Sequence, residues 1–271
     1  MLQSLFKIGS FSLHTYGLML AVGFLTGIYI TAARAKKAGE DPALIWDLSV
    51  WVIVSGIGGA RLLYVILNFD EFRGNLLSIV NPVQADGTLG IGGLVFIGGL
   101  ILAMTVTVLY LRHKKKSLLK ILDICMPGAA FGMAIGRIGC FLNGCCYGLP
   151  TKAAWGIRFP LDCPAGYYEA AMHADKLHPA QLYMVAGSLI TAILLLLLER
   201  YKKFDGHLLL IYVMFYAVDR STVDLFRYYP RSELHHGFTH NQIILCIAFV
   251  ISAVTFIRWR RKASSPAPKK S

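Results

Sequence analysis

The sequence predicts an all-α polytopic membrane protein with about seven transmembrane helices and a small periplasmic head region. Three observations predict this fold class. Hydrophobic residues make up 56% of the 271 residues and charged residues only 15%, a composition too apolar for a soluble domain. The apolar residues form long runs, and about 20 of them cross the hydrocarbon core of a bilayer. The basic residues lie in short segments between these runs.

Seven segments are apolar and long enough to be transmembrane helices. They are residues 11–33, 44–67, 91–111, 118–135, 181–198, 208–225 and 243–257. We expect residues 1–271 to form a single integral membrane domain with two additions. One is a periplasmic head insertion at residues 140–179, and the other is a basic cytoplasmic tail at residues 258–271. No cleaved signal peptide is expected, because the N-terminal region lacks a basic start and a small-residue cleavage site.

The formal net charge of +12 falls on one side of the predicted membrane. Clusters of arginine and lysine follow the first, third and fifth segments, and a further cluster lies in the tail. The positive-inside rule makes this side cytoplasmic, which places the N-terminus in the periplasm and the C-terminus in the cytoplasm. Because the charges lie in short loops of a membrane protein, no nucleic-acid partner is expected.

The chain around Arg137 predicts an anion site near the membrane surface. An arginine at the edge of a bilayer is costly without a partner, so Arg137 marks a functional site. Asn143 offers two donors and an acceptor, and Gly148 is one of several glycines that permit close backbone approach and turns.

A stripe of polar residues in the sixth segment predicts the other half of this site. Tyr216, Arg220, Asp224 and Arg227 are spaced as one helical face. Asp224 can pair with Arg220 or with Arg227, and either pairing leaves one guanidinium for an anionic ligand. Two arginines from different segments, such as Arg137 and Arg220, bind phosphate in a bidentate geometry that lysine does not provide. The ligand is then expected to be a phospholipid.

The second segment carries another arginine at membrane depth. Arg61 is expected to face the interior of the helix bundle, where an ion pair and a substrate contact are equally compatible with the sequence. The glycines around it, and the paired glycines of the third segment, predict close helix packing.

Four cysteines lie in or next to the head region, namely Cys140, Cys145, Cys146 and Cys163. Their spacing argues against zinc, because no Cys-x-x-Cys occurs and adjacent cysteines rarely ligate one ion together. We expect a structural disulfide, for example between Cys163 and one of the others, or free thiols. No metal or other cofactor is expected.

The pattern Gly-Arg-Ile-Gly-x-Phe-x-Asn-Gly-x-x-x-Gly, which begins at Gly136, resembles the signature of bacterial prolipoprotein diacylglyceryl transferases. The Tyr-Gly-Leu-Met that begins at Tyr16 and the His-Pro-Ala-Gln-Leu-Tyr that begins at His178 are similar to the same family. The resemblance implies catalytic roles for Arg137, Arg220 and Tyr16. It implies substrate binding by Arg137, Asn143, Gly148, Tyr216, Arg220, Asp224, Arg227, Arg61 and Gln181.

The resemblance also implies the activity. In the family, the diacylglyceryl group of phosphatidylglycerol is transferred to the lipobox cysteine thiol in the signal peptide of a prolipoprotein, as the first step of bacterial lipoprotein maturation. The implied partners are phosphatidylglycerol, such signal peptides and membrane lipids, and the implied location is the bacterial cytoplasmic (inner) membrane. The attacking thiol belongs to the substrate, so the protein's own cysteines need take no part. The alternative is a non-catalytic phospholipid-binding or transport protein of the same fold.

The chain departs from the family at a position often given a catalytic part. Ile97 stands where relatives carry a histidine or tyrosine, and an isoleucine cannot accept a proton. His14 and His178 are the candidate substitutes. Met184 stands where a glutamate is usual.

Overall fold

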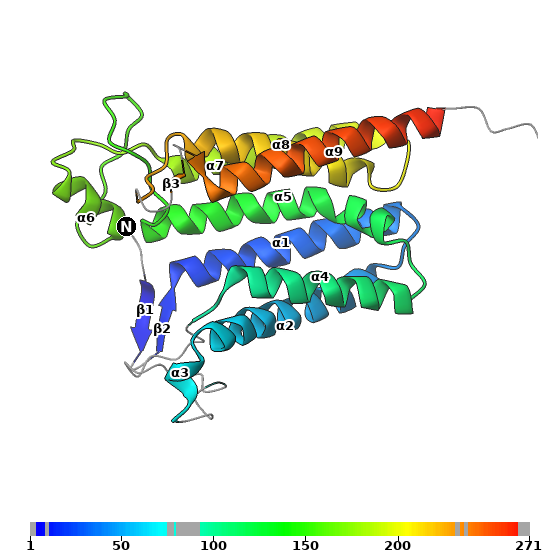
Figure 1. Ribbon diagram of the computed structural model, residues 1–271, viewed down its shortest axis with the longest axis horizontal. Helices are drawn as coiled ribbons and strands as arrows, with labels where there is room; N and C mark the ends of the chain where they lie inside the picture. Colours follow the sequence, from blue (N-terminus) through cyan, green and yellow to red (C-terminus); the bar gives the residue numbers. More distant parts are fainter. Residues whose placement is uncertain are drawn as a thin grey trace, which may run out of the picture. The chain divides into compact units, whose positions relative to one another are not determined.

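The computed structural model describes residues 4–8, 11–74, 79, 93–230, 234–235 and 238–264, and helices dominate it (Figure 1). The elements in chain order are β1 (Ser4–Ile8), β2 (Phe11–His14), α1 (Thr15–Lys37), α2 (Pro42–Leu67), α3 (Phe69–Phe72), α4 (Phe96–His113), α5 (Leu118–Asn143), α6 (Pro164–Ala171), α7 (Ala180–Leu198), η2 (Glu199–Tyr201), α8 (His207–Asp224), β3 (Leu234–His235), β4 (Phe238–Thr239) and α9 (His240–Ser264). Within this part of the chain, α1, α2, α4, α5, α7 and α9 are long and apolar enough to cross a membrane. The protein is therefore a multi-pass membrane protein.

The remaining predicted span corresponds to α8, which differs in its charge. Its 18 residues include Asp219, Arg220 and Asp224. It packs against both α7 and α9, and the three helices run side by side in Figure 1. One of these neighbours supplies a polar partner, because Asn241 of α9 donates to Asp224.

The predicted boundaries differ from the observed ones at three helices. Residues 11–14 form β2, which pairs with β1, so α1 begins at Thr15 and not at residue 11. The third span begins at Phe96, while the predicted start at Ile91 lies outside the described residues. The last helix begins at His240 and continues through Ser264, so part of the predicted tail is helical.

The chain forms two compact units. The first unit contains residues 15–31 and everything from Leu122 onward, and the second contains residues 4–14 and 32–121. In the first unit, α1 and α5 meet through glycines. A Cβ atom on Gly23 would lie 2.7 Å from the carbonyl oxygen of Gly132, and one on Gly27 would lie 2.9 Å from that of Gly128. Only glycine permits backbones to approach this closely.

A buried carboxylate joins α5 to the start of α8. Asp123 is 1% exposed, and Lys202 contacts its Oδ2 at 3.0 Å. The backbone N–H groups of Gly206 and Leu209 donate to its two oxygens at 2.8 and 2.9 Å. These are N–H groups that the first turn of a helix leaves unpaired, so Asp123 caps α8 from a neighbouring helix.

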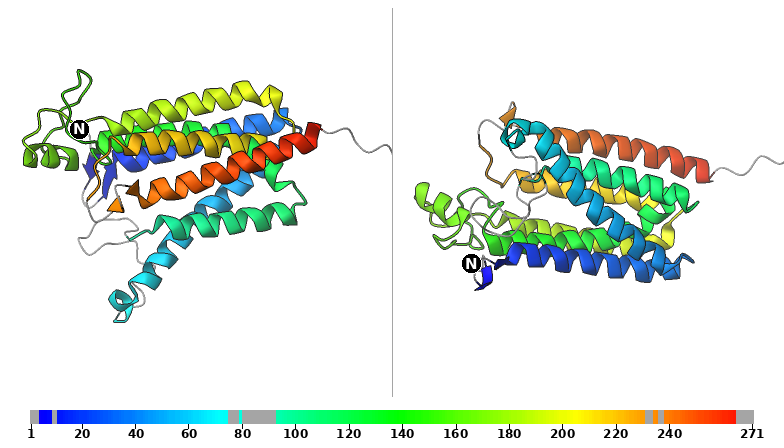
Figure 2. Two further views of the ribbon diagram at one scale, coloured as in Figure 1. Left: turned by 45° about the horizontal axis from the view of Figure 1, so that its top comes forward. Right: turned by 90° about the horizontal axis from the view of Figure 1, so that it is seen from below.

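In the second unit, α2 and α4 pack together as predicted, and Figure 2 shows them in two further views. The contact runs through Gly56, Gly59, Gly98 and Gly99, and a Cβ atom on Gly99 would lie 2.6 Å from the carbonyl oxygen of Gly56. The prediction of close packing at these glycines is confirmed.

The chain between α5 and α7 has a small core of its own. Phe159, Cys163, Ala165 and Leu177 are buried together. The backbone of Leu177 exchanges hydrogen bonds of 3.0 Å with that of Ile157. This compact segment holds the turn that follows α5 against the start of α7.

Candidate functional site

The end of α5 and the turn after it carry the glycine-rich motif. Gly144 has a φ of +70°, and the backbone N–H of Cys145 donates to the carbonyl of Cys140 at 3.1 Å. Gln181, at the start of α7, is 1% exposed and donates from Nε2 to the carbonyl oxygen of Cys145 at 2.7 Å. Gln181 therefore positions the turn. Asn143 is half-buried and is the last residue of α5.

Gly148 lies where three chain segments meet. Its N–H donates to the carbonyl of His178 at 3.0 Å, and it forms a β-bridge with Arg227. A Cβ atom on Gly148 would lie 2.6 Å from the carbonyl oxygen of Phe226. The absence of a side chain at Gly148 is what lets the chain after α8 reach the turn after α5.

The predicted helical stripe is wrong at its last member. α8 ends at Asp224, and Arg227 lies in the extended segment that pairs with Gly148. The physical reason is this pairing, which includes a 2.8 Å bond from the N–H of Leu149 to the carbonyl of Phe226. Arg227 therefore reaches the site from the end of α8 and not from its face.

Asp224 is buried and pairs with Arg220 rather than with Arg227. Nη1 of Arg220 lies 3.0 Å from Oδ1 of Asp224, and Nη2 donates to the hydroxyl of Tyr229 at 2.8 Å. That hydroxyl donates to Oδ1 of Asp224 at 2.7 Å, and Nδ2 of Asn241 donates to Oδ2 at 3.1 Å. Burial and the bond to Asp224 raise the pKa of Tyr229 to about 12, so its proton stays in place at neutral pH.

Two arginines of this region have a buried Nε that makes no hydrogen bond within the described part of the chain. Nε of Arg137 and Nε of Arg227 have no hydrogen-bond acceptor among the described residues. The guanidinium of Arg227 lies 5.1 Å from the ring centroid of Tyr229. Both arginines lie within electrostatic range of the thiol of Cys146. Buried donors of this kind are unusual and point to an anionic ligand.

The sulfur atoms of Cys140, Cys145 and Cys146 lie within 4.8 Å of one another. Hydrogen bonds from the Cys140 and Cys145 side chains lower the pKa of Cys146, and the charges of Arg227 and Arg137 lower it further. The disulfide expected for Cys163 does not form: its thiol donates to the carbonyl of Pro160 at 3.1 Å.

Tyr16 and Tyr216 border the same region. Tyr16, in α1, is 40% exposed, packs on Gly139 and lies within electrostatic range of Arg137 and of the three thiols. Tyr216, in α8, stacks on Tyr212 and also lies within range of Arg137. The structure thus brings both predicted tyrosines to the arginine site.

The sequence analysis missed three residues near this site. Asp219 lies against Gly187 and within electrostatic range of Arg137, while Tyr229 and Asn241 complete the partners of Asp224. The signal for Asp219 was present, because an acidic residue within an apolar helix marks a functional position. No comparable signal pointed to Tyr229 or Asn241.

Two residues singled out in the sequence belong to the second unit. Arg61 donates from Nε to the carbonyl of Ile79 at 2.9 Å, and its guanidinium lies 5.3 Å from the ring centroid of Phe72. Arg61 is thus held by contacts within the second unit, and the substrate contact expected for it stays a prediction. Ile97 is 59% exposed on α4.

The candidate base His178 is engaged by a neighbour. Its Nδ1 lies 2.9 Å from the hydroxyl of Tyr183, which also accepts from Nε1 of Trp155 at 2.8 Å. Burial lowers the pKa of His178, so the ring is neutral at pH 7.

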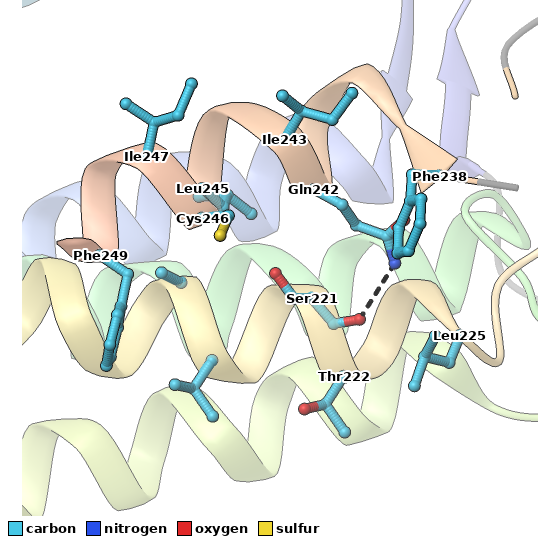
Figure 3. Close-up of a pocket in the computed structure, with 12 residues that line it drawn as sticks. Ser221, Thr222, Leu225, Phe238, Gln242, Ile243, Leu245, Cys246, Ile247 and Phe249 are labelled. Carbon is cyan, nitrogen blue, oxygen red and sulfur yellow. Dashed lines mark hydrogen bonds between the residues drawn. The ribbon is translucent and has the colours of Figure 1, made fainter. Parts of the chain in front are cut away.

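An apolar groove of about 680 Å³ lies between α8 and α9 (Figure 3). Its lining includes Leu225, Phe238, Ile243 and Phe249, and Figure 3 shows the amide of Gln242 bonded to the backbone of Ser221 at one end. Its volume is within the range of small-molecule sites, and its walls are mostly apolar.

Comparisons with known proteins show the family of this chain. The family model described as prolipoprotein diacylglyceryl transferase matches residues 3–259. A phosphatidylglycerol–prolipoprotein diacylglyceryl transferase from Clostridium tetani is 31% identical over 252 residues, which cover 93% of this chain and 95% of the relative. One from Finegoldia magna is 31% identical over 250 residues, which cover 92% of each chain. One from Prochlorococcus marinus is 28% identical over 83% of this chain and 78% of the relative. The chain therefore belongs to the prolipoprotein diacylglyceryl transferase family.

Proposed function

We propose that this transferase moves the diacylglyceryl group of phosphatidylglycerol to the lipobox cysteine thiol of a prolipoprotein signal peptide. The observation that carries the proposal is a pair of half-buried arginines, Arg137 and Arg227, whose buried Nε atoms have no partner among the described residues. The names of the relatives from Clostridium tetani and Finegoldia magna support the choice of lipid and acceptor.

The reaction assigns a task to each part of the site. The substrate thiolate attacks the glyceryl carbon that bears the phosphate ester, a C–S bond forms, and the C–O bond breaks with its electron pair left on the phosphate. Negative charge grows on that phosphate, and planar guanidinium groups stabilise it through paired hydrogen bonds. Arg137 and Arg227 are the donors available for this task.

Arg220 then has a positioning role. Both of its terminal nitrogens are engaged, by Asp224 and by Tyr229. It fixes the end of α8, from which the chain leads to Arg227. Asn143, Gly148 and Gln181 shape the turn that brings the two arginines together, and Tyr16 and Tyr216 border the phosphate.

The groove between α8 and α9 is a candidate for one acyl chain of the lipid. Ser221 and Gln242 lie at one end of it, and Arg220 precedes Ser221 on α8. A lipid with its phosphate at the arginines therefore has an apolar surface for its tail on the same helix.

The location proposed is the bacterial inner membrane, with the N-terminus and the arginine site on the periplasmic side. The basic residues after α1, α4 and α7 support this orientation. A reporter that is active only in the cytoplasm, fused after Ser271, is expected to be active. A silent cytoplasmic reporter together with an active periplasmic one would reverse the topology.

The direct test is transfer by the purified protein in lipid nanodiscs. Phosphatidylglycerol with labelled acyl chains and a lipobox peptide should give a peptide that carries the label and the mass of one diacylglyceryl group. The same peptide with serine at its cysteine is the matched control and should stay unmodified. A protein that binds the lipid and moves no label to either peptide would favour the non-catalytic lipid-binding or transport alternative.

A further inference from the structure

The three thiols beside the arginines form a cluster that the transfer chemistry described so far does not use. Cys140 is 7% exposed, Cys145 and Cys146 are half-buried, and all three sulfur atoms lie within 4.8 Å of one another. No histidine or carboxylate of the described chain joins this group. A tetrahedral zinc ion holds its sulfur ligands at about 2.3 Å, which separates them by about 3.8 Å. The cluster is therefore close to the dimensions of a three-cysteine zinc site.

The backbone holds two adjacent cysteines in a conformation that makes this possible. Cys146 has a φ of +60°, in a left-handed region that residues other than glycine seldom occupy. Two hydrogen bonds fix the turn. The N–H of Cys145 donates to the carbonyl of Cys140, and Nε2 of Gln181 donates to the carbonyl of Cys145. Sequence spacing argued against a shared ion because neighbouring side chains usually diverge. Here the turn directs both to Cys140, and such a maintained backbone outlier points to function.

We propose that Cys140, Cys145 and Cys146 bind a zinc ion whose fourth position receives the thiol of the prolipoprotein substrate. Zinc sites with three protein ligands leave a position open, whereas structural sites close all four. A thiol that coordinates zinc is deprotonated outright. The inference rests on the proposed function, and it supplies the thiol activation that Ile97 does not.

The chemistry balances without an oxidant or a reductant. On binding, the substrate thiol gives its proton to solvent and its sulfur to the ion. That sulfur then attacks the glyceryl carbon, the C–O bond breaks, and the electron pair leaves with the phosphate as glycerol phosphate. The thioether product is uncharged and is a weaker ligand than a thiolate, so the product dissociates and the position reopens.

The surrounding charges suit this arrangement. Three thiolates and a Zn²⁺ ion carry a net charge of about −1, and a bound substrate thiolate makes it about −2. Arg137 and Arg227 both act on Cys146, so two positive charges adjoin the site. The same two arginines are proposed to hold the lipid phosphate, which places the attacking sulfur next to the bond that breaks.

The metal site is tested first by composition and spectroscopy. Intact protein purified without chelators is expected to contain about one zinc ion per chain. Cys140→Ser, Cys145→Ser and Cys146→Ser should each weaken zinc binding by roughly 100-fold or more, as expected when a direct ligand is lost. Cys125→Ser is the matched control, because Cys125 lies about 22 Å away along the same helix, at 1.5 Å per residue. Metal that is absent from the natural chain, or unchanged in all three variants, would overturn the inference.

The open position is tested with Co²⁺ in place of zinc in the natural chain, which needs no variant to fold. A lipobox peptide should strengthen the sulfur-to-cobalt charge-transfer band, and the peptide with serine at its cysteine should not. Equal responses to both peptides would contradict thiol binding. A second outcome would also overturn the proposal: the three thiolates bind monovalent copper, and the spectrum responds to neither peptide. Such a three-coordinate copper site has no open position for the substrate thiol.

Activity separates this inference from the proposed function. A thiol with a pKa of about 8.5 is about 3% ionised at pH 7 and half ionised at pH 8.5. Removal of zinc should therefore slow transfer by up to about 30-fold at pH 7 and by about twofold at pH 8.5. A chelated protein that transfers lipid at the full rate at both pH values would overturn the zinc site and leave the transferase intact. Zinc-loaded protein that responds to the cysteine peptide and transfers no lipid would overturn the proposed function alone.

Discussion

Asp123 and Arg137 are two charged residues on α5, and they differ in whether their buried polar atoms have hydrogen-bond partners. The carboxylate of Asp123 has Lys202 at 3.0 Å and two backbone N–H donors at 2.8 and 2.9 Å. Arg137 keeps a buried Nε with no acceptor in the described chain. A satisfied buried charge serves the scaffold, whereas a buried donor without an acceptor costs stability and indicates a ligand.

The same contrast divides the two arginines at and after the end of α8. Arg220 is bonded to Asp224 and Tyr229, while Nε of Arg227 has no partner among the described residues. Partners, rather than sequence position, therefore separate the residues that build the site from those that are available to bind the substrate.

The largest effect is expected from the loss of the scaffold charge. Asp123→Ala leaves Lys202 without its buried partner and uncaps α8, and it should cost about 3–5 kcal/mol of stability. Thermal unfolding in detergent, followed by tryptophan fluorescence, measures the change. The matched control is Asp205→Ala, because Asp205 contacts the same lysine at 3.0 Å from an exposed position. The control should cost less than about 1 kcal/mol, and equal losses would refute the scaffold role of Asp123.

The next effect should fall on activity and spare the fold. Arg137→Lys and Arg227→Lys are each expected to lose about 2–4 kcal/mol of transition-state stabilisation, roughly 30- to 1,000-fold in kcat/KM. The unfolding temperatures of these two variants should barely change, because the planar guanidinium group of each arginine is used to bind the ligand. Arg220→Lys is the comparison variant and should lose stability as well, since it breaks the contacts to Asp224 and Tyr229. Unaltered turnover in both Arg137→Lys and Arg227→Lys would contradict the proposal that these two arginines hold the lipid phosphate.

The smallest effect concerns a solvent-accessible cluster of charges in the second unit, formed by Glu40, Lys116 and Lys120. Hydrogen bonds from Lys116 and Lys120, each 2.6 Å long, lower the pKa of Glu40 below its ordinary value of 4.5. Its stabilisation is therefore complete above about pH 4.5 and is lost as the pH falls through the lowered pKa. Because the lysines are partly exposed, Glu40→Gln should cost about 1 kcal/mol or less at pH 7.

The measurement for Glu40 is unfolding temperature as a function of pH for the natural chain and the variant. The difference between the two should be constant above pH 5 and should vanish in acid. If the difference in unfolding temperature instead grows in acid, the protonated form of Glu40 stabilises the fold more than the ionised form, which contradicts the prediction.

The helices could be predicted because a bilayer demands long apolar runs, and this demand is local in the sequence. Their ends could not be predicted as well, because residues 11–14 pair with β1 and α9 continues into a basic segment. The packing of Gly56 and Gly59 on α4 followed from their spacing. The contact of Gly23 with Gly132 did not, because 109 residues separate them and neither lies in a glycine pair.

The site was predicted where one motif carries it and missed where distant segments complete it. Arg137 and Gly148 lie in a single run, so their proximity was visible in the sequence. The partners of Asp224 come from Tyr229 and Asn241, beyond the end of α8, and helical periodicity cannot reveal them. The convergence of Cys145 and Cys146 depends on a positive φ at Cys146, a backbone state that the sequence does not specify.

The charges of α8 have a consequence for how the protein enters the membrane during synthesis. Each Asp or Arg at the centre of an inserting helix costs about 2.5–3.5 kcal/mol on the insertion scale. With Asp219, Arg220 and Asp224, α8 is a poor substrate for the translocon on its own. Arg220 and Asp224 pair within α8, and the hydrogen bond from Nδ2 of Asn241 to Oδ2 of Asp224 forms only when α9 is present. The burial of α8 in the bilayer is therefore most favourable once α9 lies beside it and this last polar contact is made.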